Sequence, residues 1–154
     1  EVTSVWPGSA IAHMLRTVLA DGVITHDERE HMLTELQSLA GTDFSSTGSS
    51  SSNVVGLPYD HGTSIIIPGS AICHTGVFLF GTRAACEKLT EKAGGTALQA
   101  VTRKATYLVV GTHVSPAWVG TSYGRKIQQA MELKQAGHPI SIIAEEWWLN
   151  ACCN

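Results

Sequence analysis

Tyr107-Leu108-Val109-Val110-Gly111 is the most informative stretch of the chain, because its first four residues are all apolar or aromatic. A wholly apolar run of this length is typical of an inner strand in a parallel sheet, which helices cover on both faces. Three more strands are predicted at 71–75, 96–100 and 140–143, where apolar residues alternate with polar ones or stand beside them. Three helices are predicted from apolar residues at helical spacing in 82–93, 123–136 and 145–152. This order predicts an α/β fold with a four-stranded parallel sheet flanked by three helices.

A helical hairpin is predicted ahead of the sheet. Apolar residues recur at helical spacing at Ile11, Met14, Leu15, Val18 and Leu19. Asp21-Gly22 ends this helix, and the Thr25-x-x-Glu28 pattern is a capping box that begins a second one. Because 45–53 contains no apolar residue, it reads as a flexible linker. We assign 1–40 to the hairpin, 41–63 to a Ser/Gly-rich linker, and 64–154 to the domain that contains the sheet.

Composition indicates a globular protein of 154 residues, with 44% apolar and 15% charged residues. The charge is uneven along the chain, since residues 1–63 carry 2 basic and 8 acidic side chains, whereas 64–154 carry 8 basic and 5 acidic ones. A mildly basic second part permits nucleic-acid binding without requiring it. No apolar run approaches the roughly 20 residues that span a bilayer, so no membrane partner is expected.

The four cysteines are expected to be reduced, small hydrophobic residues, which favours a cytoplasmic location. They are Cys73, Cys86, Cys152 and Cys153, and none stands in a C-x-x-C pair. A zinc site that combines Cys152-Cys153 with His74 or His138 lacks the usual ligand spacing. We therefore predict no metal site.

Polar and cationic residues follow a predicted strand and begin two predicted helices. Thr75-Gly76 ends the strand at 71–75, Arg83 begins the next helix, and Lys126 begins a later one. In a wound α/β layer these positions gather at one edge of the sheet, where helix N-termini add partial positive charge. We predict a phosphate-binding site there, called the phosphate seat. Two further cations, Arg125 and Lys104, are expected to flank it.

Simpler interpretations of the same residues stay open. Thr75-Gly76 also fits a turn that merely needs a glycine, and Arg83 also fits a solvated helix residue. Trp148 is expected in the core, whereas Trp118, in a polar stretch, is a candidate for stacking on a base or a partner. Glu145 and Glu146 begin the last helix, where acidic residues ordinarily match the helix dipole.

The second part of the chain, 64–154, resembles the BRCT domain. Five separated motifs stand in that family's order: Thr75-Gly76, Gly94-Gly95, Tyr107-Leu108-Val109-Val110-Gly111, Lys126 and Trp148-Leu149-Asn150-Ala151-Cys152. Within that family, the sequence resembles the BRCT domains of bacterial NAD-dependent DNA ligases and of the replication factor C large subunit. The arrangement with an N-terminal helical hairpin also resembles bacterial BRCT-containing proteins.

The resemblance implies a non-catalytic binding module in DNA replication or repair, associated with the nucleoid. It implies that Thr75, Gly76, Arg83 and Lys126 hold a phosphate, with the 5′-phosphate of a DNA end as the leading partner. A phosphorylated or acidic partner protein is the alternative, and a third possibility is an accessory domain of a DNA ligase-like chain. Catalysis is disfavoured because the sequence has no Lys-x-Asp-Gly string for adenylation and no Walker, G-x-S-x-G or H-E-x-x-H motif. No cofactor is indicated.

Overall fold

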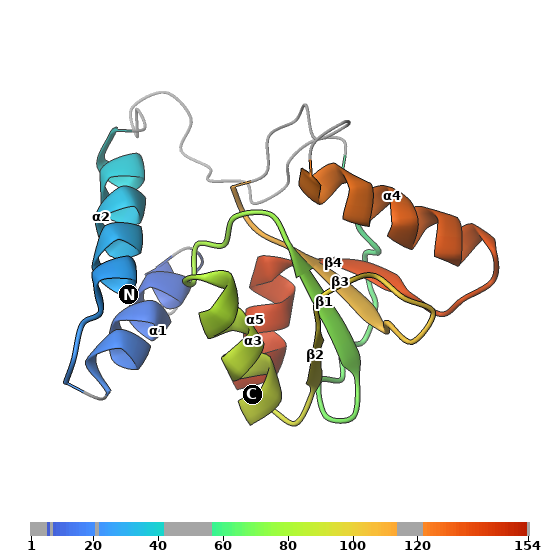
Figure 1. Cartoon of the computed structure of the whole chain (residues 1–154), viewed down its shortest axis with the longest axis horizontal. Coiled ribbons are helices and arrows are strands. Elements are labelled where there is room, and N and C mark those ends of the chain that lie inside the picture. Colours follow the sequence, from blue (N-terminus) through green and yellow to red (C-terminus); the bar gives the residue numbers. More distant parts are fainter. Residues whose placement is uncertain (1–5, 7, 21, 42–56, 114–121, 154) are drawn as a thin grey trace.

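The computed structural model describes residues 6, 8–20, 22–41, 57–113 and 122–153. Its centre is a sheet of four parallel strands in the order β2-β1-β3-β4 (Figure 1). The strands are β1 (Ala71–Thr75), β2 (Thr96–Leu98), β3 (Tyr107–Val110) and β4 (Ser141–Ala144). The predicted α/β class with a four-stranded parallel sheet is confirmed. All four residues of β3 are buried, as expected for an inner strand.

Three helices cover the two faces of this sheet. Helices α3 (Arg83–Lys92) and α5 (Glu145–Cys153) share one face, and α4 (Ser122–Gln135) covers the other (Figure 1). Successive strand residues point to opposite faces, so β1 sends Ile72 to the first core and Cys73 to the second. Trp148 of α5 is wholly buried in the first core, as the sequence predicted.

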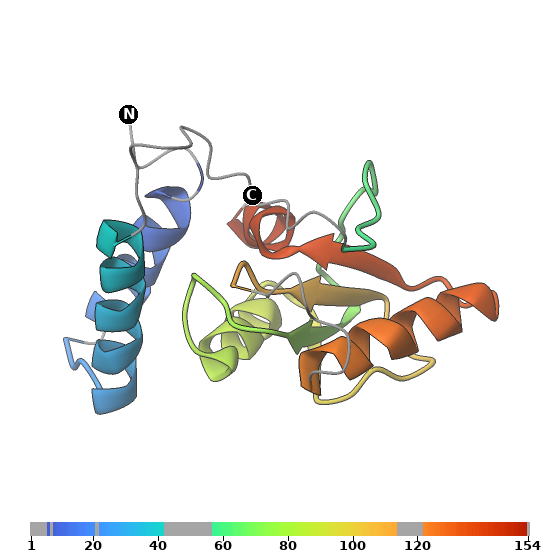
Figure 2. The ribbon, with the colours of Figure 1, turned by 90° about the horizontal axis from the view of Figure 1, so that it is seen from above.

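Two helices precede the sheet, α1 (Gly8–Leu19) and α2 (His26–Gly41). The predicted capping box of α2 is confirmed, because Thr25 donates its backbone N–H to Glu28 over 2.9 Å and the N–H of Glu28 donates to the Thr25 hydroxyl over 3.3 Å. Figures 1 and 2 show both helices on the side of the molecule where α3 lies. Among the described residues, no helix is long and apolar enough to cross a membrane.

The buried face of α1 differs from the predicted one. Ala10, Met14 and Val18 are buried, and Ala10 joins the core between α3 and α5. Leu15 and Leu19, two members of the predicted apolar stripe, are instead 36% and 61% exposed. The helix therefore packs through a narrower stripe at four-residue spacing and leaves part of its apolar surface in solvent.

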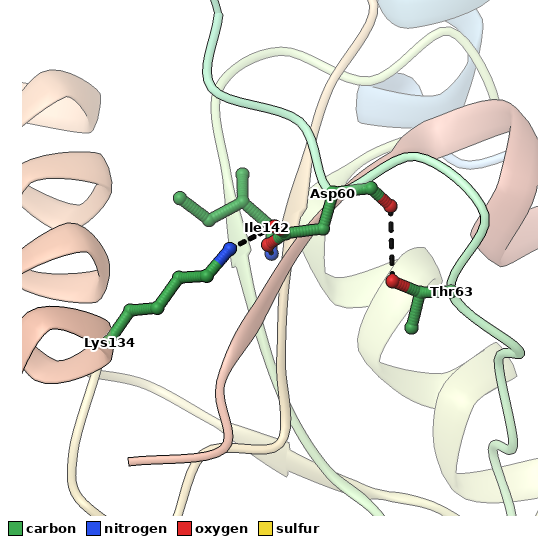
Figure 3. Close-up of polar contacts among 4 residues, drawn as sticks. All are labelled: Asp60, Thr63, Lys134 and Ile142. Atoms are coloured by element: carbon green, nitrogen blue, oxygen red, sulfur yellow. Dashed lines mark hydrogen bonds and ion pairs between the residues drawn. The ribbon is translucent and has the colours of Figure 1, made fainter. Parts of the chain in front are cut away.

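A segment placed in the linker by the sequence contacts the outer edge of β4 (Figure 3). The backbone N–H of Asp60 donates to the carbonyl of Ile142 over 2.8 Å, and the N–H of Ile142 donates to Asp60 Oδ2 over 2.8 Å. The other oxygen of the same carboxylate pairs with Lys134 of α4. Three residues earlier, Leu57 is buried in the α4-side core. Asp60 thus satisfies an edge strand whose backbone groups would otherwise face solvent or a second chain.

Replacing Asp60 with alanine is expected to lower the free energy of unfolding by about 1–2 kcal/mol, because the N–H of the buried Ile142 loses its acceptor. Lys134→Gln removes only an exposed ion pair and is expected to cost less than about 1 kcal/mol. Urea unfolding of the two variants measures both values. Equal losses in the two variants would show that the ion pair, rather than the backbone contact, holds this segment.

Glu145, the first residue of α5, is only 1% exposed and ties two loops to the start of that helix. Its carboxylate accepts the backbone N–H groups of Leu79 over 3.0 Å and Phe80 over 2.7 Å, in the loop after β1. It also accepts the N–H of Thr112 over 2.9 Å and the hydroxyl of Thr112 over 2.6 Å, in the loop after β3. Burial raises the pKa of Glu145, and these hydrogen bonds partly offset that effect. The residue does far more than match a helix dipole.

Glu145→Gln is expected to destabilise the fold by about 1–3 kcal/mol, because an amide nitrogen cannot accept from the buried N–H groups that face it. The exposed Glu132→Gln on α4 serves as the matched control and is expected to change stability by less than about 0.5 kcal/mol. Denaturant midpoints at neutral pH give the comparison. Indistinguishable midpoints for the two variants would contradict a structural role for the Glu145 carboxylate.

Candidate functional site

The carboxyl end of β1 turns sharply at the predicted seat. Thr75 is the last strand residue and is wholly buried, and its carbonyl accepts the N–H of Gly111 over 2.9 Å. Gly76 follows with a φ of 87°, a left-handed conformation that side chains other than glycine rarely adopt. The glycine is therefore required by the turn itself, whatever it binds.

Helix α3 is the next element after this turn and begins at Arg83. Thr82 is its N-cap, since the Thr82 hydroxyl accepts the N–H of Ala85 over 3.3 Å. Arg83 is the first helical residue, and its side chain is exposed. A cation at a helix N-terminus opposes the helix dipole, which costs stability unless an anion is present.

Lys126 of α4 reaches the same strand end from the opposite face of the sheet. Its ammonium donates to the carbonyl of Gln99 over 2.9 Å and to the carbonyl of His74 over 3.3 Å, and it contacts Cys73 Sγ at 3.6 Å. The side chain thus links α4 to β1 and to the residue that follows β2. An ammonium has three donors, so a bound anion would compete with acceptors of the protein itself.

Arg83 and Lys126 both act electrostatically on residues of β1. Arg83 and Lys126 both lower the pKa of His74, and both act on the thiol of Cys73. Glu87, one turn after Arg83 on α3, also acts on Cys73 and accepts a hydrogen bond from the Gln99 side chain over 3.1 Å. The seat therefore combines two cations from opposite faces of the sheet with one carboxylate at its margin.

The remaining predicted contacts are placed differently. Arg125 is exposed beside Lys126. Lys104 is exposed in the turn that leads into β3, and Thr106 of this segment donates to the carbonyl of Ala71, the first residue of β1. Lys104 therefore lies at the end of the sheet where the strands begin. The seat lies at the end where they finish, so the structure does not bring Lys104 to it. Trp118 lies outside the described residues.

His74, considered from the sequence only as a zinc ligand, is a buried residue next to the seat. It is 1% exposed, its Nε2 lies 3.2 Å from the Thr90 hydroxyl, and the indole N–H of Trp148 donates to the same hydroxyl over 3.0 Å. The rings of Phe78 and Trp148 meet the imidazole edge-on, with centroids 5.7 and 5.2 Å away. Burial, together with Arg83 and Lys126, lowers the pKa of His74 to about 4.

The four cysteines are free thiols, and burial raises the pKa of Cys73 and Cys86. Within the described part of the chain, no three His, Cys, Asp or Glu side chains cluster closely enough to hold a metal ion. No protein-family model matches the sequence, and a search of curated proteins finds no match. The functional argument therefore rests on the geometry of the seat.

Stability is expected to depend on pH through His74. Because the pKa of His74 in the folded protein, about 4, lies below the ordinary histidine value of 6.5, the stability that neutral His74 contributes is complete above about pH 6.5 and is lost as the pH falls toward 4. The loss attributable to His74 reaches about 3 kcal/mol at full protonation. Urea unfolding at about pH 7 and about pH 4.5 should show a larger decrease for the natural chain than for His74→Gln. The same decrease in both proteins would contradict this assignment.

Proposed function

We propose that the chain is a non-catalytic phosphate-binding module, with a BRCT-like domain behind an N-terminal helical hairpin. Its leading ligand is the 5′-phosphate of a DNA end, bound at the phosphate seat. The observation that carries the proposal is the hydrogen bond of Lys126 to the carbonyl of His74, two residues before the turn at Gly76, while Arg83 acts electrostatically on the same histidine from the other face of the sheet. The order of strands and helices is the one that the sequence resemblance implies.

The seat supplies the groups that a phosphate monoester requires. Arg83 offers a planar guanidinium at the first turn of α3, where backbone N–H groups also point outward. Lys126 adds an ammonium that is already held in place by the Gln99 and His74 carbonyls. Thr75 is buried beneath the turn, so its part in the proposal is to hold the backbone of Gly76.

Binding of a 5′-phosphorylated duplex and of the same duplex without the phosphate tests the proposal by fluorescence anisotropy at fixed salt. The phosphorylated duplex is expected to bind at least about tenfold more tightly, as charge-assisted hydrogen bonds contribute about 1.5–3 kcal/mol. Arg83→Gln should remove most of this difference. Lys126→Gln should do the same, with thermal unfolding as a check that the variant is folded.

Lys104→Gln is the matched control, because it removes one positive charge at the far edge of the sheet. It is expected to weaken both duplexes slightly and equally, since a general electrostatic contact does not distinguish the end group. Equal affinity of the natural chain for the two duplexes would sink the proposal. So would an equal effect of Lys104→Gln and Arg83→Gln on the preference for the phosphate.

A protein-interaction module is the second candidate, because apolar side chains are exposed on the N-terminal helices and the turn between them. They are Leu15, Leu19, Val23, Ile24 and Leu33. Exposed apolar groups of this kind often mark partner surfaces. A phosphorylated or acidic partner would then use the seat as well. Loss of partner binding in Leu19→Ser, without any DNA binding by the natural chain, would favour this function over the first.

A further inference from the structure

His74 combines burial with an unused ring nitrogen at the base of the phosphate seat. It precedes Thr75 on β1, and its own carbonyl accepts a hydrogen bond from Lys126. Its Nε2 is engaged by the Thr90 hydroxyl, whereas Nδ1 has no hydrogen-bond partner among the described residues. Buried polar atoms in native proteins are nearly always paired, so an orphaned one needs a reason.

The charged groups around His74 come from two of the packed elements. Helix α3 contributes Arg83, and α4 contributes Lys126, both of which act directly on the imidazole. Helix α5 contributes only the neutral indole of Trp148, and Phe78 from the loop after β1 is also neutral. The positive potential at His74 thus comes from the two cations of the phosphate seat.

An anion in the seat would change that potential. A phosphate monoester beside Arg83 and Lys126 would offset the two positive charges that oppose protonation of His74. Burial would still lower the pKa of His74, because it disfavours the charged imidazole. A bound anion would therefore reverse only the part of the lowering that Arg83 and Lys126 cause. By linkage, a ligand that favours protonation of a group binds more tightly to the protonated protein.

We propose that anion binding at the phosphate seat is coupled to proton uptake by His74. This inference rests on the proposed function, since it concerns the same seat. In this proposal the protonation of His74 responds to the bound anion, but His74 does not contact the anion, because the imidazole is buried and already contacts Thr90.

Nuclear magnetic resonance of the full chain labelled at histidine tests the coupling. The ring carbon signals are followed against pH in the free protein and with saturating 5′-phosphorylated duplex. The titration midpoint of His74 is expected to rise by about one pH unit on binding, because the bound phosphate offsets the positive charges of Arg83 and Lys126 that oppose protonation. The signals of His138, which lies between α4 and β4 at the end of the sheet where the strands begin, serve as the internal control.

Calorimetric proton counting gives a second readout at about pH 5 in two buffers of different ionisation enthalpy. The natural chain should release fewer protons on binding than His74→Gln, and His74→Gln should still bind at neutral pH. The phosphate group itself would release protons when it binds cations, so its contribution has the opposite sign. Duplex binding with an unchanged His74 midpoint overturns the coupling but leaves the proposed function intact. Absence of phosphate-dependent binding overturns both.

Discussion

The buried carboxylate of Glu145 is the contact on which the candidate site depends. It holds the backbone of Leu79 and Phe80, at a sequence separation of 65 residues for the latter, and through Thr112 it holds the loop after β3. A carboxylate that accepts several buried N–H groups cannot be replaced by another side chain without leaving donors unpaired. The loops on either side of the seat therefore keep a fixed position relative to α5.

Close backbone packing reinforces the same constraint. A Cβ added at Gly111 would lie only 2.2 Å from the carbonyl oxygen of Val77, so the loop after β1 crosses directly over the end of β3. The N–H of His113 donates to that carbonyl over 3.1 Å. The path from Gly76 toward α3, which begins at Arg83, is thus constrained by backbone contacts.

The sequence predicted the sheet because the signal for a buried strand is local. The apolar runs at β1, β3 and β4 each indicate a strand without any knowledge of its neighbours. The roles of Glu145 and Asp60 could not be predicted this way, since each depends on partners far away in the chain. The exposure of Leu19 was also missed, because the sequence shows the apolar stripe of α1 but does not show how much of that stripe packs against the rest of the protein. The position of Lys104 could have been deduced from the sequence. In a parallel sheet all strands begin at one end and finish at the other, and Lys104 stands just before the start of β3.

The two cations of the seat differ in what they can give to an anion. Lys126 already donates to two main-chain carbonyls, which fixes the ammonium and reduces the entropy lost on binding, but also supplies it with competing acceptors. Arg83 is exposed and makes no hydrogen bond or ion pair within the described residues, so its five donors are available. The sequence placed both residues at helix starts, but α4 begins at Ser122, four residues before Lys126. Arg83 is therefore the better candidate for direct contacts with a phosphate, and Lys126 is the better candidate for a fixed positive charge beside it.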